Sequence, residues 1–165
     1  MKVYAAYGSN INLEQMAIRC PDARPIEKGW LMDYQLMFLS NSGGYGVATV
    51  EPCRGRRVPI LLWAIDPACE EALDRYEGWP YLYRKETLPV SGITWMLNDI
   101  TDMPAEVTEV PAMIYIMNAR YPAPPSATYL ETITEGYRAV GFHLRYLAEG
   151  VRRTQRRMGG PQRRK

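Results

Sequence analysis

An apolar segment that stops abruptly at a turn of small polar residues is the feature that most constrains the fold of this chain. Residues 1–7 are apolar at nearly every position, which predicts a buried strand. The strand runs into Gly8-Ser9-Asn10, and a short helix is expected just beyond it, over 13–19. Such a turn presents successive backbone N–H groups above the end of the strand. It forms either an anion-binding nest or a plain capping turn.

The remaining elements predict a mixed α+β fold. Further strands are expected over 25–40, 45–51, 58–65, 83–90 and 110–117, with a turn at 41–44 and an exposed arginine loop at 54–57. Helices are expected over 67–76 and from Ser126 to about Glu149, where Gly136 and Gly141 indicate close packing or a break. Five to six strands and about three helices that do not alternate strictly predict a curled or barrel-like sheet.

The charge distribution divides the chain into an acidic body and a basic end. The last fourteen residues contain seven of the basic residues and no acid, which leaves 13 basic against 18 acidic residues in the rest. We therefore expect one domain over 1–150 and a basic tail over 151–165. Nucleic acid is not an expected partner of the body. The tail either contacts nucleic acid or an acidic partner, or is a frayed extension of the last helix.

The composition also limits the location and the chemistry. No apolar stretch approaches the roughly 18–20 residues that span a bilayer, and the N-terminal run is too short for a signal peptide, so we expect a cytoplasmic protein. Cys20, Cys53 and Cys69 are an odd number at wide spacing and are expected to be reduced thiols. With His143 as the single histidine, they cannot build a usual zinc site, and most nucleophile–histidine dyads are excluded.

Glu77 is the candidate general base. It follows the helix expected over 67–76, and Gly78, Trp79 and Pro80 come directly after it. The C-terminus of a helix and an apolar wall both disfavour an ionised carboxylate, so a raised pKa is expected. A carboxylate with a pKa near neutrality can take and return a proton. The alternative is a solvated acid at the end of a helix.

Four motifs follow one another in a particular order along the chain. They are Tyr7-Gly8-Ser9-Asn10, then Tyr76-Glu77-Gly78 with Tyr83, then Tyr115 in an apolar strand, then Pro125-Ser126 with Tyr129. In this order the chain resembles the γ-glutamylcyclotransferase-like family, which includes the γ-glutamylamine cyclotransferases and the plant AIG2-like proteins. The resemblance extends over residues 3–150, apart from an insertion at about 91–109, and it does not include the tail.

The resemblance implies an enzyme that cleaves a small γ-glutamyl amide. The α-amino group of the substrate would attack its own γ-carbonyl, releasing an amine and closing 5-oxoproline, so no protein nucleophile, metal or cofactor would be needed. Glu77 would move the protons, and the backbone of the turn at 7–10 would hold the glutamyl group. Tyr83 and Tyr115 would line the pocket near Glu77, and Tyr129 would close it.

The sequence leaves open which leaving group is used and whether the protein is catalytic at all. The leaving group would be chosen by the variable segments 41–46, 54–57 and 91–109, and an arginine-rich loop at the mouth would favour acidic leaving groups. The alternative is that this loop is simply exposed to solvent and takes no part in choosing the leaving group. A second hypothesis is a binding or stress-response module that keeps the fold and the pocket without turnover, although binding alone does not need the proton shuttle that Glu77 offers.

Overall fold

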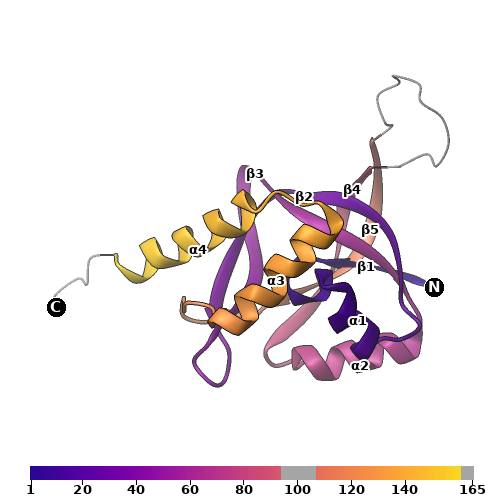
Figure 1. Cartoon of the computed structure of the whole chain (residues 1–165), viewed down its shortest axis with the longest axis horizontal. Coiled ribbons are helices and arrows are strands. Elements are labelled where there is room, and N and C mark those ends of the chain that lie inside the picture. Colours follow the sequence, from indigo (N-terminus) through magenta and orange to yellow (C-terminus); the bar gives the residue numbers. More distant parts are fainter. Residues whose placement is uncertain (94–106, 161–165) are drawn as a thin grey trace.

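Within the part of the chain that the structure describes, five strands form a barrel, and helices pack around it (Figure 1). A computed structural model describes residues 1–93 and 107–160. In these ranges the chain forms β1 (Lys2–Ala6), a 3-10 turn η1 (Ser9–Ile11), α1 (Leu13–Arg19), β2 (Arg24–Ser40), β3 (Gly46–Ile65), α2 (Pro67–Glu77), β4 (Tyr83–Ile93), β5 (Val107–Met117), α3 (Ala127–Val140) and α4 (Arg145–Met158).

The strands close into a barrel in the order β1-β3-β2-β4-β5. Neighbouring strands are antiparallel, except that β1 runs parallel to β5 and pairs with it through Tyr4 and Met113. The largest fully buried side chains include Leu31, Phe38, Ile60, Leu62, Ile65, Ile114 and Tyr115 from the strands and Leu73 and Tyr137 from the helices. The predicted α+β fold with a barrel-like sheet is confirmed.

The segment from 45 to 65 is one strand and not two. The turn at 41–44 is confirmed, and residues 54–57 are exposed as expected. However, β3 pairs with β2 on both sides of residues 53–56, so the expected hairpin between 45–51 and 58–65 is wrong. Gly55 does adopt a left-handed conformation, with φ of 82°, as a turn glycine would. It lies in a bulge of β3, where residues 53–56 stand opposite Asp33, whose carboxylate accepts a hydrogen bond from the Gly55 N–H at 2.9 Å. The bulge inserts extra residues into β3, and Arg57 resumes the pairing opposite Met32.

The long helix expected after Ser126 is two helices. Gly141 has φ of 80° and ends α3 with its N–H bonded to the carbonyls of Arg138 and Tyr137, a left-handed cap that favours glycine. Gly136 has the other expected role, close packing. A Cβ at Gly136 would lie 2.8 Å from the backbone nitrogen of Asn12, so α3 rests directly on the chain that follows the turn at 7–10.

The expected boundary at residue 150 falls inside α4. Thr154 is completely buried, and its hydroxyl accepts a hydrogen bond from the Phe38 N–H at 3.0 Å. Arg153 donates to the carbonyl of Leu36 at 2.6 Å. Residues 151–158 therefore continue a helix that packs on β2, and they are not a frayed extension.

The structure also bears on the expected state of the cysteines and on the insertion expected at 91–109. A disulfide joins Cys20, at the end of α1, to Cys69 in the first turn of α2, so the expectation of reduced thiols is wrong for this pair. Cys53 is a free thiol. Of the insertion expected at 91–109, the two ends belong to β4 and β5, and residues 94–106 lie outside the described residues.

None of the helices in residues 1–93 and 107–160 combines the length and the apolar character that a membrane span requires.

We predict that Gly136→Ala destabilises the protein by about 1–2 kcal/mol, because the added methyl group must displace the Asn12 backbone, and this cost exceeds the gain in helix propensity. Thermal denaturation measures the difference. The control is Gly159→Ala, where the nearest neighbour of a Cβ would be a carbonyl oxygen 3.5 Å away. Equal or higher stability of Gly136→Ala would contradict the close packing of α3 on the turn.

Candidate active site

The eight residues that the sequence proposed for the site line one pocket. Its volume is about 200 Å³, and it is lined by the end of β1, η1, the C-terminal end of α2 and parts of β3, β4, β5 and α3. The expected residues in its wall are Tyr7, Gly8, Ser9, Asn10, Glu77, Tyr83, Tyr115 and Tyr129. The other lining residues are Tyr4, Asn41, Val47, Ala48, Tyr76 and Leu82. Of these, Asn41 belongs to the segment 41–46 considered for the choice of leaving group and Tyr76 to the Tyr76-Glu77-Gly78 motif, and no role in the site is expected from the sequence for the rest.

The turn after β1 forms one wall of the pocket because β1 ends at Ala6 and the chain winds into η1. The hydrogen bonds of this turn begin with the N–H of Ile11, which donates to the carbonyl of Gly8 at 3.1 Å. The N–H groups of Ser9 and Asn10 come before that first bond, where a short helix leaves its donors unpaired. Gly8 is required by close approach, since a Cβ there would lie 3.1 Å from the Cβ of Ala48.

Glu77 is the last residue of α2 and faces the turn. Gly78, with φ of 68°, ends the helix at this point. The side-chain amide of Asn10 donates to Glu77 Oε1 at 3.1 Å. Burial raises the pKa of Glu77 from 4.5 to about 7, although the positive charge of Arg19 and the bond from Asn10 both act in the opposite direction. This carboxylate can therefore exchange a proton near neutral pH.

The side chains that enclose Glu77 are not the expected ones. Trp79 and Pro80 do not line the pocket, and the Trp79 side chain is 42% exposed, with the Lys85 ammonium 4.2 Å from its ring centre. The wall consists of buried tyrosines such as Tyr4 and Tyr7. The expectation that Trp79 and Pro80 shield the carboxylate is wrong, but burial raises its pKa as expected, through other side chains.

Asn10 is fixed from four directions. Its amide nitrogen donates both to Glu77 and to the hydroxyl of Tyr4, the latter at 2.9 Å. The indole N–H of Trp63 donates to its backbone carbonyl at 3.1 Å, and Arg19 donates to its side-chain oxygen. Because the oxygen accepts from arginine, the nitrogen must point toward Glu77. No sequence motif indicated that Arg19, the last residue of α1, orients Asn10.

The pocket tyrosines hold the walls together through their hydroxyl groups. Tyr83 donates to the carbonyl of Ala48 at 2.6 Å, and Tyr129 accepts from the N–H of the same residue at 2.9 Å. Tyr7 donates to the carbonyl of Tyr115. Burial raises the pKa of Tyr7, Tyr83 and Tyr129, so these phenols stay neutral. Tyr129, which accepts from Ala48, keeps its own proton available for donation.

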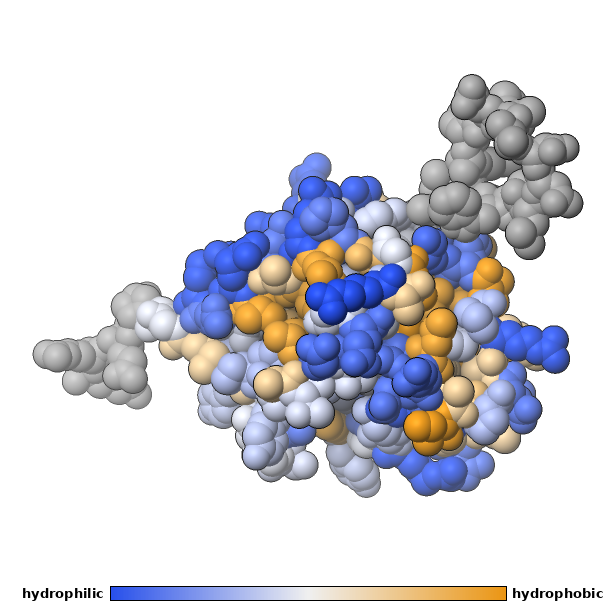
Figure 2. Space-filling view, viewed as in Figure 1, coloured by the Kyte–Doolittle hydropathy of each residue, from blue (hydrophilic) through white to orange (hydrophobic). Residues whose placement is uncertain are grey.

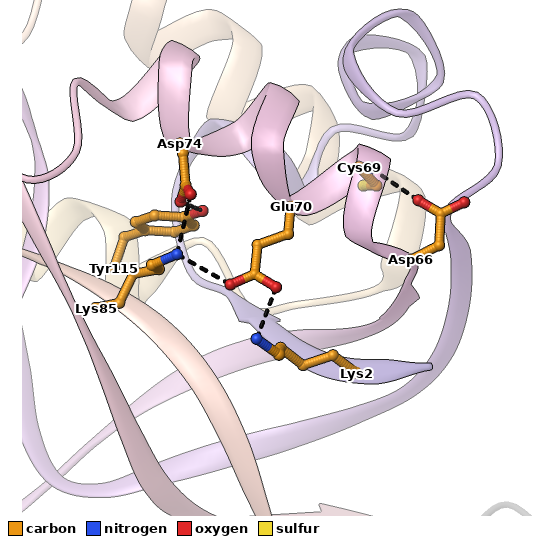
Figure 3. A network of polar contacts seen from close by, with 7 residues as sticks. All are labelled: Lys2, Asp66, Cys69, Glu70, Asp74, Lys85 and Tyr115. Atoms are coloured by element: carbon orange, nitrogen blue, oxygen red, sulfur yellow. Dashed lines mark hydrogen bonds and ion pairs between the residues drawn. The ribbon is translucent and has the colours of Figure 1, made fainter.

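A polar network beneath α2 fixes the helix end that carries Glu77 (Figure 3). Asp74, three residues before Glu77, accepts from the hydroxyl of Tyr115 at 2.7 Å and from Lys85 at 2.9 Å. The lysine also binds Glu70 at 2.9 Å, and Lys2 binds the other oxygen of that carboxylate. The network ties α2 to β1, β4 and β5, so the direction of Glu77 depends on contacts made outside the pocket.

The segments that were expected to choose the leaving group divide between two places. Asn41 lines the pocket, in agreement with the role expected for 41–46. The segment 54–57 does not line it. It borders a separate depression beside α4, so its expected position at the mouth is wrong. Within the described ranges, no cluster of three His, Cys, Asp or Glu side chains is placed to hold a metal ion.

Comparison with known proteins places this chain in a family. The sequence model described as "Gamma-glutamyl cyclotransferase, AIG2-like" matches residues 4–137. The gamma-glutamylcyclotransferase of Homo sapiens is 27% identical over 150 residues, covering 87% of this chain and 74% of that protein. The Bos taurus protein of the same name gives the same identity and coverage. The chain belongs to the gamma-glutamyl cyclotransferase, AIG2-like family.

Solved structures agree with this assignment. A structure named gamma-glutamyl cyclotransferase superimposes with a TM-score of 0.75 at 26% identity, covering 90% of this chain and 85% of that one. An AIG2-like protein from Mus musculus superimposes with a TM-score of 0.53 at 18% identity, covering 79% of this chain and 82% of that one, and it shows the shared fold alone.

We predict that Glu77→Gln stabilises the folded protein at pH 8 relative to the unaltered chain, and does so much less at pH 4. The folded pKa of about 7 lies above the ordinary value of 4.5, so the folded state holds a proton that the unfolded chain loses between these values. The stability of the unaltered chain therefore falls through that window as pH rises.

Urea denaturation at several pH values measures this difference. Glu71→Gln is the matched control, because Glu71 is exposed on the same helix. A stability difference between Glu77→Gln and the unaltered chain that does not change from pH 4 to pH 8 would contradict the raised pKa.

Proposed function

We propose that this protein cyclises the glutamyl part of a small γ-glutamyl amide, forming 5-oxoproline and releasing an amine or amino acid. Family membership and the fold support cyclotransferase activity. The observation that carries the proposal is the Glu77 carboxylate, with a pKa of about 7, hydrogen-bonded to Asn10 in the pocket beside the Gly8 turn. The acid and the glutamyl-binding turn that the reaction needs are thus within reach of one small substrate.

In the proposed mechanism the nucleophile belongs to the substrate. Glu77 takes a proton from the α-ammonium group, and the freed amine attacks the γ-carbonyl to form a five-membered ring. The carbon–nitrogen bond to the leaving group then breaks as that nitrogen is protonated. Two protons move in total from the α-nitrogen to the leaving nitrogen, and Glu77 transfers them one at a time. The products are a neutral lactam and an ammonium ion.

The turn at 7–10 is proposed to bind the glutamyl group and the developing oxyanion. The N–H groups of Ser9 and Asn10 precede the first hydrogen bond of η1 and are available as donors. An oxyanion needs preorganised donors, and Arg19 and Trp63 hold Asn10 in place before any substrate arrives.

The tyrosines are proposed to fold the substrate for attack. Tyr83, Tyr115 and Tyr129 are fixed by hydrogen bonds at 2.6 to 2.9 Å, so they offer rigid walls and not mobile contacts. Holding the amine against the carbonyl supplies much of the rate of an intramolecular reaction. The chemistry uses groups of the substrate and one carboxylate, so the proposal needs no cofactor.

We predict that the unaltered chain releases 5-oxoproline from at least one member of a panel of γ-glutamyl amides and γ-glutamyl amino acids. Glu77→Gln should lower this rate by about a hundredfold or more, the usual contribution of general acid–base catalysis. Chromatography of 5-oxoproline measures the rate. Circular dichroism and the binding of a γ-glutamyl ligand should show that the variant is folded and retains its pocket.

Glu71→Gln is the control and should keep full activity, since its side chain is exposed and paired with Arg75. Undiminished turnover by Glu77→Gln would exclude this residue as the base. Ligand binding without any 5-oxoproline from the unaltered chain would favour a non-catalytic binding module on the same fold.

A further inference from the structure

Two arginine-rich segments that are far apart in the sequence meet beside α4. The segment 54–57 of β3 and the residues of α4 border a depression of about 220 Å³. The residues that line this depression do not include any that line the Glu77 pocket. Figure 2 shows hydrophilic side chains gathered over α4 and the neighbouring part of the barrel. We call the depression the arginine pocket, after Arg56, Arg57, Arg145 and Arg153 in its wall.

Two of these arginines converge on a single oxygen atom. Arg57 and Arg145 donate to the hydroxyl of Tyr146 at 3.1 Å and 2.9 Å respectively. The guanidinium of Arg57 also lies 4.0 Å from the ring centre of Trp30, so an aromatic face orients it. The positively charged guanidinium groups of Arg57 and Arg145 are therefore close together around the neutral hydroxyl of Tyr146, and this acceptor does not compensate their charge.

Arg56 and Arg153 add two further positive charges to the wall of the arginine pocket. Arg153 is partly buried and donates to a backbone carbonyl. Burial lowers the pKa of Arg153, and the nearby charge of Arg56 lowers it further. Glu149 is the one carboxylate that lines the arginine pocket. Among the described residues, none of the four arginines is within ion-pair distance of a carboxylate.

We propose that the arginine pocket binds a compact phosphate group, such as inorganic phosphate or pyrophosphate. The planar guanidinium fork matches phosphate oxygens in two-point hydrogen bonds, and several such forks face one cavity here. Arg145 is also the first residue of α4, so the positive end of the helix dipole lies on the same side. A multiply charged anion would offset the repulsion among the four arginines, which Glu149 alone leaves uncompensated.

We predict that pyrophosphate binds the unaltered chain measurably, and that Arg56→Gln and Arg145→Gln each weaken this binding by about tenfold, the effect of one charge-assisted hydrogen bond. Isothermal titration calorimetry at constant ionic strength measures the affinity. Arg152→Gln is the matched control, since Arg152 is an exposed arginine of α4 that does not line the pocket. Release of 5-oxoproline should be unchanged in all three variants, because the two pockets are separate.

Two results would overturn the proposal. One is the absence of pyrophosphate binding, or an equal loss of affinity in Arg152→Gln, which would indicate a diffuse field and not a site. The other is tighter binding of a single-stranded RNA oligonucleotide than of pyrophosphate, with all three variants weakened alike, which would indicate a nucleic-acid surface. Arg56 makes no hydrogen bond or ion pair within the described residues, so Arg56→Gln tests the charge without removing a structural contact.

Discussion

The hydrogen bond from the side-chain amide of Asn10 to the carboxylate of Glu77 defines the site, and it forms only when the turn, α1, α2 and the barrel are all in place. It joins the turn after the first strand to the end of α2, 67 residues later. Asn10 is oriented by Arg19 and Trp63, and Glu77 is oriented by the helix end that Asp74 ties to β4 and β5. The barrel brings these elements together, and a change in any of them alters the same hydrogen bond.

The raised pKa of Glu77 lowers the free energy of unfolding at pH values where its carboxyl group is ionised. A carboxylate shielded by buried tyrosines holds its proton more tightly than it would in water, so the folded state is less stable at pH values where this group is ionised. The neighbouring Lys2–Glu70–Lys85–Asp74 network consists of paired charges that are partly exposed, so it contributes little free energy and acts mainly by positioning α2.

The residues of the pocket could be named from the sequence because they lie in short motifs whose order resembles a known family, although each motif by itself left an alternative open. The turn at 7–10 and Glu77 are recognisable in this way. The roles of Arg19 and Asp74 could not be predicted, because they depend on which helices the barrel brings side by side. The same reason explains the unexpected disulfide, whose cysteines are 49 residues apart. The long strand β3 was missed because Gly55 indicates a turn in the sequence, whereas in the structure it lies in a bulge of β3 and the pairing with β2 resumes beyond it.

The most direct test of the account is the pH dependence of kcat/KM for 5-oxoproline release from a γ-glutamyl amide by the unaltered chain. Catalysis by ionised Glu77 predicts that kcat/KM rises with pH and inflects near pH 7, where this carboxyl group loses its proton. A profile that is flat through pH 7, and rises only where the ammonium group of the free substrate ionises, would contradict the proposed role of Glu77.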